Sequence, residues 1–188
     1  MRLREKYEKE IVPEIMRKFS LKNRFEVPRL EKIVVASSFA KMVSQKTKEE
    51  KEKIIEEILN CLAQITGQKP VLTQAKKSIS GFSLKKGEKI GAKVTLRKKR
   101  AFDFLEKLIN IVLPRVRDFK GIKESSFTKE GILTVGIDDI SAFPEISLEK
   151  LKFPFGLEVN IVFKGTKKRN LREMIIEILK LSNLPIIK

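Results

Sequence analysis

The chain has 188 residues, of which 41 are Lys or Arg and 24 are Asp or Glu, so its net charge is +17 at pH 7. This positive surplus is typical of proteins that bind nucleic acid, and an apolar fraction of 41% is sufficient for a folded core. The chain contains no histidine and one cysteine, which excludes a histidine-dependent catalytic triad, an internal disulfide and a cysteine-based zinc cluster.

We therefore expect a protein that is not an enzyme and that needs no cofactor or metal. No apolar run approaches the roughly 20 residues that cross a bilayer, so we expect no membrane partner. The length and the absence of a Gly/Ser linker favour a single domain over residues 1–188.

The apolar pattern predicts helices and strands in an irregular order. In chain order we expect a helix at 2–19, a strand at 29–37, a helix at 47–66, strands at 70–73 and 92–99, a helix at 101–118, strands at 131–137 and 156–164, and a helix at 168–181. Pro13 predicts a kink or a break in the first helix. This order favours an α+β fold, in which helices cover one face of a mostly antiparallel sheet and leave the other face open.

The most basic part of the chain begins after the fourth of these elements and runs through the fifth. The stretch from Gln74 to Arg100 holds ten Lys or Arg residues and one acid, Glu88. Charge this dense must face water or a polyanion, because an unpaired ammonium is costly to desolvate. The glycines at 81, 87 and 91 predict a reaching loop over 74–91.

The strand expected at 92–99 has one polar face. Lys93, Thr95 and Arg97 alternate with apolar residues, and Lys99 would extend the row. Alternate residues of a strand are about 7 Å apart, which resembles the spacing of successive phosphates. The row can therefore follow a nucleic-acid backbone, and Thr95 can bind a sugar or a base. The alternative is a solvated basic strand without a ligand.

Other features have two interpretations each. Phe82, the one aromatic residue of the loop, can stack on a base or anchor the loop to the body of the protein. Asp138 and Asp139 can hold Mg²⁺ only if a turn brings both carboxylates together, and a solvated turn is the simpler interpretation. The region 121–163 holds four bases and seven acids, which predicts a separate contact with a basic protein.

Four blocks of the sequence resemble one family, the bacterial-type large-subunit ribosomal protein five, which binds 5S rRNA. The blocks are VPRLEKIVV (27–35), ITGQKPVLTQAKKSISGFSLKKGEKIGAKVTLR (65–97), FLEKLINIVLPRVRDFKG (104–121) and AFPEI (142–146). The resemblance implies a structural protein of the central protuberance, on a cytoplasmic or organellar ribosome. It also implies neighbouring large-subunit proteins and, across the subunit interface, small-subunit protein thirteen as partners.

The resemblance also assigns roles to residues. It implies that Gln68 and Thr95 contact 5S rRNA, and we add their basic neighbours Lys69, Lys93 and Arg97 to the rRNA-binding set. The loop that matches 73–91 approaches P-site transfer RNA in the family. The loop residues expected near that RNA are Lys76, Lys77, Ser78, Phe82, Lys85 and Lys86.

The chain departs from the family pattern at three places. Ala36 stands where the family has an RNA-binding Asn, so that hydrogen bond is lost and the following turn is expected to be reshaped. The segments 127–133 and 138–140 differ from the family's bridge region. A free-standing RNA chaperone or regulator, and a Lys- or carboxylate-dependent enzyme that acts on nucleic acid, are the alternative functions.

Overall fold

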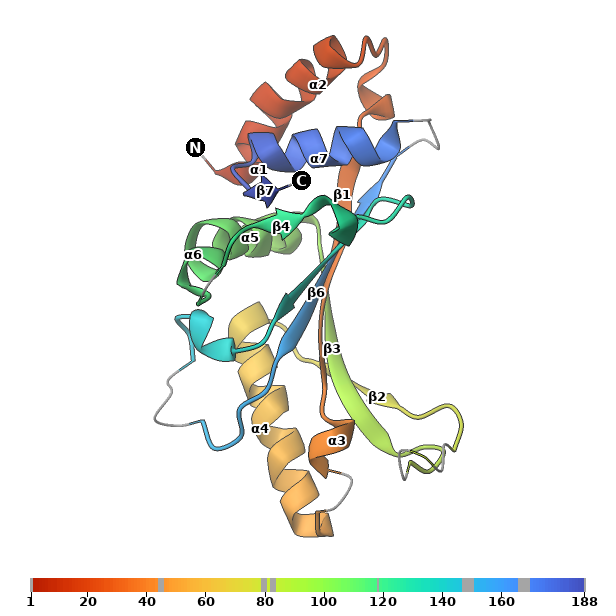
Figure 1. Cartoon of the computed structure of the whole chain (residues 1–188), viewed down its shortest axis with the longest axis vertical. Coiled ribbons are helices and arrows are strands. Elements are labelled where there is room, and N and C mark those ends of the chain that lie inside the picture. The colour runs from red at the N-terminus through yellow and green to blue at the C-terminus, as the bar shows by residue number, and fades with distance from the viewer. Residues whose placement is uncertain are drawn as a thin grey trace. The chain divides into compact units, whose positions relative to one another are not determined.

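The computed structural model describes residues 2–43, 46–78, 81, 84–117, 119–146, 151–165 and 170–187 (Figure 1). The helical segments are α1 (Leu3–Lys6), η1 (Tyr7–Ile11), α2 (Val12–Lys18), η2 (Arg24–Glu26), α3 (Ala40–Val43), α4 (Lys48–Thr66), α5 (Lys98–Lys107), η4 (Leu108–Val112), α6 (Leu113–Arg115), η5 (Glu124–Ser126), η6 (Ile140–Ala142) and α7 (Leu171–Leu181). The strands are β1 (Arg29–Ser38), β2 (Val71–Gln74), β3 (Lys89–Arg97), β4 (Ile122–Lys123), β5 (Ile132–Ile137), β6 (Leu157–Lys164) and β7 (Ile186–Ile187). None of the helices in these ranges is long and apolar enough to cross a membrane.

The strands form two sheets. The larger is antiparallel with five strands in the order β2-β3-β1-β6-β5, and the smaller pairs β4 with β7 in parallel. The α+β fold predicted from the sequence is therefore confirmed. The short strands β4 and β7 were not expected, because two residues are too few to leave a period-two pattern.

The residues cluster into two compact units. Unit 1 comprises 1–33, 96–135 and 160–188, and unit 2 comprises 34–95 and 136–159. The boundaries fall inside β1, β3, β5 and β6 rather than in a linker. The single domain expected over 1–188 stays a prediction.

Pro13 does not break the first helix. The chain is helical through α1, η1 and α2, and η1 is a π turn in which the Val12 N–H donates to Tyr7 O, five residues back. In an α-helix the proline ring clashes with the carbonyl four residues earlier, and the wider turn removes that clash. The same arrangement precedes Pro114, where η4 is the π turn. Of the two predicted outcomes, a kink or a break, the break does not occur, and the helix is distorted by a widened turn.

Tyr7 links the first helix of unit 1 to the start of β1. Its hydroxyl donates to Pro28 O at 2.6 Å, and its ring centroid lies 5.6 Å from that of Phe102. Burial raises the pKa of Tyr7 to about 12, so the phenol remains a hydrogen-bond donor at neutral pH. A buried phenol that keeps its partner fixes the packing of both elements.

In unit 2, α4 covers one face of the strands (Figure 1). Its N-terminus is closed by a capping box, in which the Glu50 N–H donates to Thr47 Oγ1 and the Thr47 N–H donates to Glu50 Oε2. Its C-terminus ends at Gly67, whose φ of 63° is left-handed. The buried stripe of the helix consists of Ile54, Ile55, Ile58, Leu62 and Ile65. This stripe packs on the buried side of the sheet and leaves the opposite side open.

Two boundaries differ from the predicted ones in the basic region. Strand β3 begins at Lys89 rather than at residue 92, and it ends at Arg97 because Lys98 adopts a φ of 52° and starts α5. Lys99 therefore does not extend the row on the strand. Gly91 belongs to β3 rather than to a loop, and a Cβ there would meet Ser37 O at 2.8 Å.

Candidate nucleic-acid interface

The outward face of β3 carries the polar row that the sequence predicts. Ala92 and Val94 are 1% exposed, whereas Lys93 is exposed and Thr95 is half-buried. Because successive side chains of a strand point to opposite faces, burial of the apolar residues forces the polar ones outward. Thr95 and Lys93 thus face solvent on the side of the sheet that α4 does not cover.

Arg97 is the next outward residue of β3. Its Nη1 lies 3.6 Å from Glu31 Oε1, and its side chain is still 55% exposed. An exposed pair at this distance contributes little to stability. The guanidinium therefore remains accessible to an anion.

Gln68 lies against Thr95. The Gly67 turn directs the chain back from α4, and Gln68 Nε2 donates to Thr95 O at 3.2 Å. Lys69 follows as an exposed residue, and the antiparallel pairing of β2 with β3 begins with Val71 opposite Lys93. The structure therefore brings together residues that are 27 positions apart in the chain.

Val71 is a member of this face that sequence reasoning missed. Its side chain is 62% exposed, and residues directly opposite in an antiparallel pair project to the same side. It therefore stands beside Lys93 as an apolar contact surface. The four residues of β2 show no apolar and polar alternation, so the sequence carried no signal that assigns a face to Val71.

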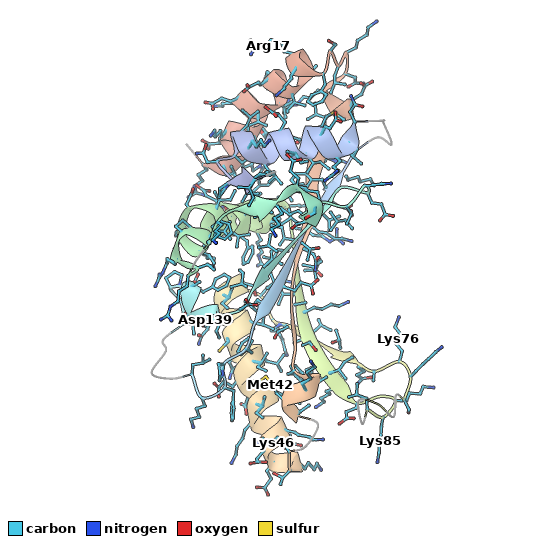
Figure 2. The ribbon with its side chains drawn as sticks, viewed as in Figure 1. Arg17, Met42, Lys46, Lys76, Lys85 and Asp139 are labelled. Carbon is cyan, nitrogen blue, oxygen red and sulfur yellow. The ribbon has the colours of Figure 1, made fainter. Side chains whose placement is uncertain are left out.

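The loop between β2 and β3 displays the lysines expected near transfer RNA. Figure 2 shows Lys76 and Lys85 at the end of this hairpin, with both side chains directed away from it. Lys77 and Lys86 are exposed as well, and the Lys86 N–H donates to Ser78 Oγ at 3.0 Å. Phe82 lies outside the described residues.

Glu88 anchors the base of this loop, a role that its sequence position did not reveal. Its carboxylate accepts from the Lys85 N–H at 3.2 Å and from Lys51 Nζ at 3.2 Å, and Lys51 lies on α4. The Ala75 N–H donates to Glu88 O at 2.9 Å. The hydrogen bond from Lys85 first, and that from Lys51 second, lower the pKa of Glu88. The one acid of the basic stretch therefore fixes the loop to the helix.

The departures at Ala36 and at the paired aspartates have local explanations. Ala36 is half-buried inside β1, which continues to Ser38 before α3 begins, so this position offers no polar side chain.

The Ser141 N–H donates to Asp139 Oδ1 at 2.9 Å, which confirms a turn there. Within the described part of the chain, no group of three acidic, His or Cys side chains is placed to hold a metal ion.

Comparison with known proteins confirms the resemblance found in the sequence. The family model described as "Ribosomal protein L5" matches residues 23–85, and the model for the C-terminus of the same ribosomal protein family matches residues 89–181. The chain is 48% identical over 161 residues to large ribosomal subunit protein uL5 of Caldanaerobacter subterraneus subsp. tengcongensis, with 86% of this chain and 87% of the relative covered. It is 43% identical over 183 residues to uL5 of Halothermothrix orenii, with 97% of each chain covered. It is 41% identical over 174 residues to uL5 of Clostridium acetobutylicum, with 93% of each covered.

The anchoring role of Glu88 predicts a change in loop dynamics when its charge is removed. In Glu88→Gln we expect amide hydrogen exchange at Lys85 and Gly87 to become roughly threefold to tenfold faster, because two charge-assisted hydrogen bonds are weakened. In the wild type the same loosening should appear as the pH falls through the lowered pKa of Glu88, and it should be absent above the ordinary Glu range. The control is Glu5→Gln, an exposed glutamate outside the loop, in which we expect exchange at Lys85 and Gly87 to be unchanged. Unchanged exchange in Glu88→Gln as well would contradict the anchoring role of Glu88.

Proposed function

This chain belongs to the ribosomal protein L5 family, and we propose that this structural, non-enzymatic protein of the large ribosomal subunit binds 5S rRNA in the central protuberance. The binding surface is the outward face of β3 with the adjoining turn: Gln68, Lys69, Lys93, Thr95 and Arg97. The observation that supports it is the hydrogen bond from Gln68 Nε2 to Thr95 O, which places Gln68 beside the strand that exposes Lys93. Because the similar proteins are bacterial, we assign the protein to cytoplasmic ribosomes, beside other large-subunit proteins.

The two kinds of side chain on this face have different tasks. Lys69, Lys93 and Arg97 neutralise phosphates and release counterions, which supplies affinity without sequence information. Thr95 and Gln68 present neutral polar groups between the cations, which suit a 2′-hydroxyl or a base edge. Lys93 and Thr95 lie two residues apart on one strand, and a hydrogen bond holds Gln68 beside them, so we expect the face to select a folded RNA by shape.

Charge removal at Lys93 and Arg97 tests this face. We expect the double variant Lys93→Gln with Arg97→Gln to bind 5S rRNA more weakly than the wild type. In a plot of the logarithm of affinity against the logarithm of salt concentration, its slope should be smaller in magnitude by about 1.8, since each neutralised phosphate contributes about 0.9. The wild type, with about six phosphate contacts, should lose about a thousandfold in affinity between 50 and 200 mM salt. Filter binding across this salt range measures both quantities.

Lys129→Gln is the matched control, because Lys129 is an exposed lysine outside the face. It should bind 5S rRNA as the wild type does. A wild-type plot without a salt slope, or a double variant indistinguishable from Lys129→Gln, would reject the face.

The lysines of the β2–β3 loop form a second part of the proposal: they approach P-site transfer RNA. In a variant with Lys76, Lys77, Lys85 and Lys86 changed to Gln, we expect faster release of transfer RNA from the P site of assembled ribosomes. Binding of 5S rRNA should stay close to that of the wild type, because the loop lies beyond the β3 face. If this variant lost binding of 5S rRNA while transfer RNA left the P site at the wild-type rate, the loop would be a contact with 5S rRNA instead.

The acid-rich region 121–163 completes the proposal as the contact with small-subunit protein thirteen across an intersubunit bridge. Asp138 is exposed next to the η6 turn and offers a rim charge for a basic partner. Rim charges change association rates more than affinities. Asp138→Asn should therefore slow subunit joining at low salt, measured by light scattering, and a joining rate equal to that of the wild type would count against the bridge.

A further inference from the structure

Unit 1 contains a cationic cavity that is separate from the β3 face. It has a volume of about 850 Å³ and is bordered by the first helix, the η2 turn, the start of β1 and the start of α5. Six cationic residues contribute to its lining: Arg4, Arg24, Arg29, Lys98, Lys99 and Lys164. These residues come from four separate segments of the chain, so no local pattern of sequence indicates that they meet.

The positive charge of this cavity is not neutralised by the protein. Glu8 is the one acid of its lining, and it pairs with Arg4 at 3.3 Å. Among the described residues, no acidic side chain forms an ion pair with Arg24, Arg29 or the three lysines. Cations gathered around a concave surface focus a positive potential into it. The cavity is therefore suited to an anion.

Phe25 adds an aromatic surface at the same place. Its side chain is 81% exposed, the largest value among the exposed large apolar residues of the described chain. The Phe25 N–H donates to Asn23 Oδ1 at 2.9 Å, and the Val27 N–H donates to Arg24 O at 3.2 Å before Val27 becomes buried. The short η2 turn is thus fixed on both sides and holds the ring in solvent. A single exposed apolar residue is common, but here it lines a cavity rich in arginine.

The part of the cavity lining that comes from α5 depends on an unusual backbone conformation. Lys98 has a φ of 52°, a region that residues with a Cβ rarely occupy. This conformation turns the chain from β3 directly into α5 and places Lys98 and Lys99 on the cavity lining. The fold therefore positions the two lysines by a feature that costs free energy, which is common at binding sites.

We infer that this cavity is a second RNA site, which holds one unstacked nucleotide with its base on Phe25 and its flanking phosphates on Arg24, Arg29 and the lysines. Guanidinium groups bind phosphate oxygens through paired hydrogen bonds, and an exposed aromatic ring stacks on a base of any identity. A lipid surface would need more exposed apolar side chains than Phe25 alone. The site uses no residue of the β3 face, so it can be tested separately from the binding of 5S rRNA to that face.

The test uses the full-length protein and a single-stranded hexaribonucleotide that contains one 2-aminopurine, whose fluorescence falls when it stacks. We expect quenching on the wild type and on Phe25→Tyr, which keeps the ring. In Phe25→Leu, which keeps the apolar bulk, quenching should be lost at the protein concentration that saturates the wild type, because the affinity of the site should fall about 5- to 150-fold. Thermal melting checks that these variants are folded, which the exposure of Phe25 favours.

Four further variants locate the signal. Arg24→Gln with Arg29→Gln should reduce the salt slope of quenching by about 1.4, at about 0.7 per phosphate of a single strand, whereas the matched control Arg17→Gln on α2 should not (Figure 2). Quenching should persist in Phe82→Leu, which removes the loop aromatic, and in Lys93→Gln with Arg97→Gln, which weakens the β3 face.

Two results would overturn the inference. The first is quenching by Phe25→Leu equal to that of the wild type. The second is binding to phosphatidylserine vesicles by the wild type but not by Phe25→Leu, together with displacement of the hexanucleotide by the same vesicles. The cavity would then bind a lipid surface rather than RNA. Loss of quenching in Phe25→Leu together with intact 5S rRNA binding would separate this site from the proposed function.

Discussion

The display of positive charge in unit 2 depends on the burial of one side of β3. Because Ala92 and Val94 are buried, Lys93 and Thr95 project from the opposite side of the strand. Hydrophobic burial thus decides where the positive charge of the chain is displayed. A register shift of one residue would reverse both faces, so the same packing that stabilises the fold also protects the binding surface.

The polar contacts refine an arrangement that apolar packing has already set. The hydrogen bond from Gln68 to Thr95 O joins the end of α4 to β3, and the Lys51–Glu88 pair joins its beginning to the hairpin loop. Both contacts connect the helix with the basic segment. The basic segment is therefore held in place by one neutral amide and by one ion pair whose two charges cancel, which leaves the positive potential of the other lysines available to RNA.

Much of this fold was predictable because it follows local patterns. The period of α4, its capping residues and the alternation in β3 are all present in short windows of sequence. The structure differs where the cause is a backbone conformation that has no composition signal. The π turn before Pro13 keeps the helix intact, and the left-handed Lys98 ends β3 before Lys99.

Contacts between distant segments explain the rest. The role of Glu88 depends on Lys51 in another element, and the cavity of unit 1 collects residues from four segments. The most direct test of the binding face is lysine acetylation of the protein, free and bound to 5S rRNA, read by mass spectrometry. We expect the RNA to protect Lys69 and Lys93 and to leave Lys123 and Lys129 reactive. Equal reactivity of Lys93 in both states would contradict this assignment.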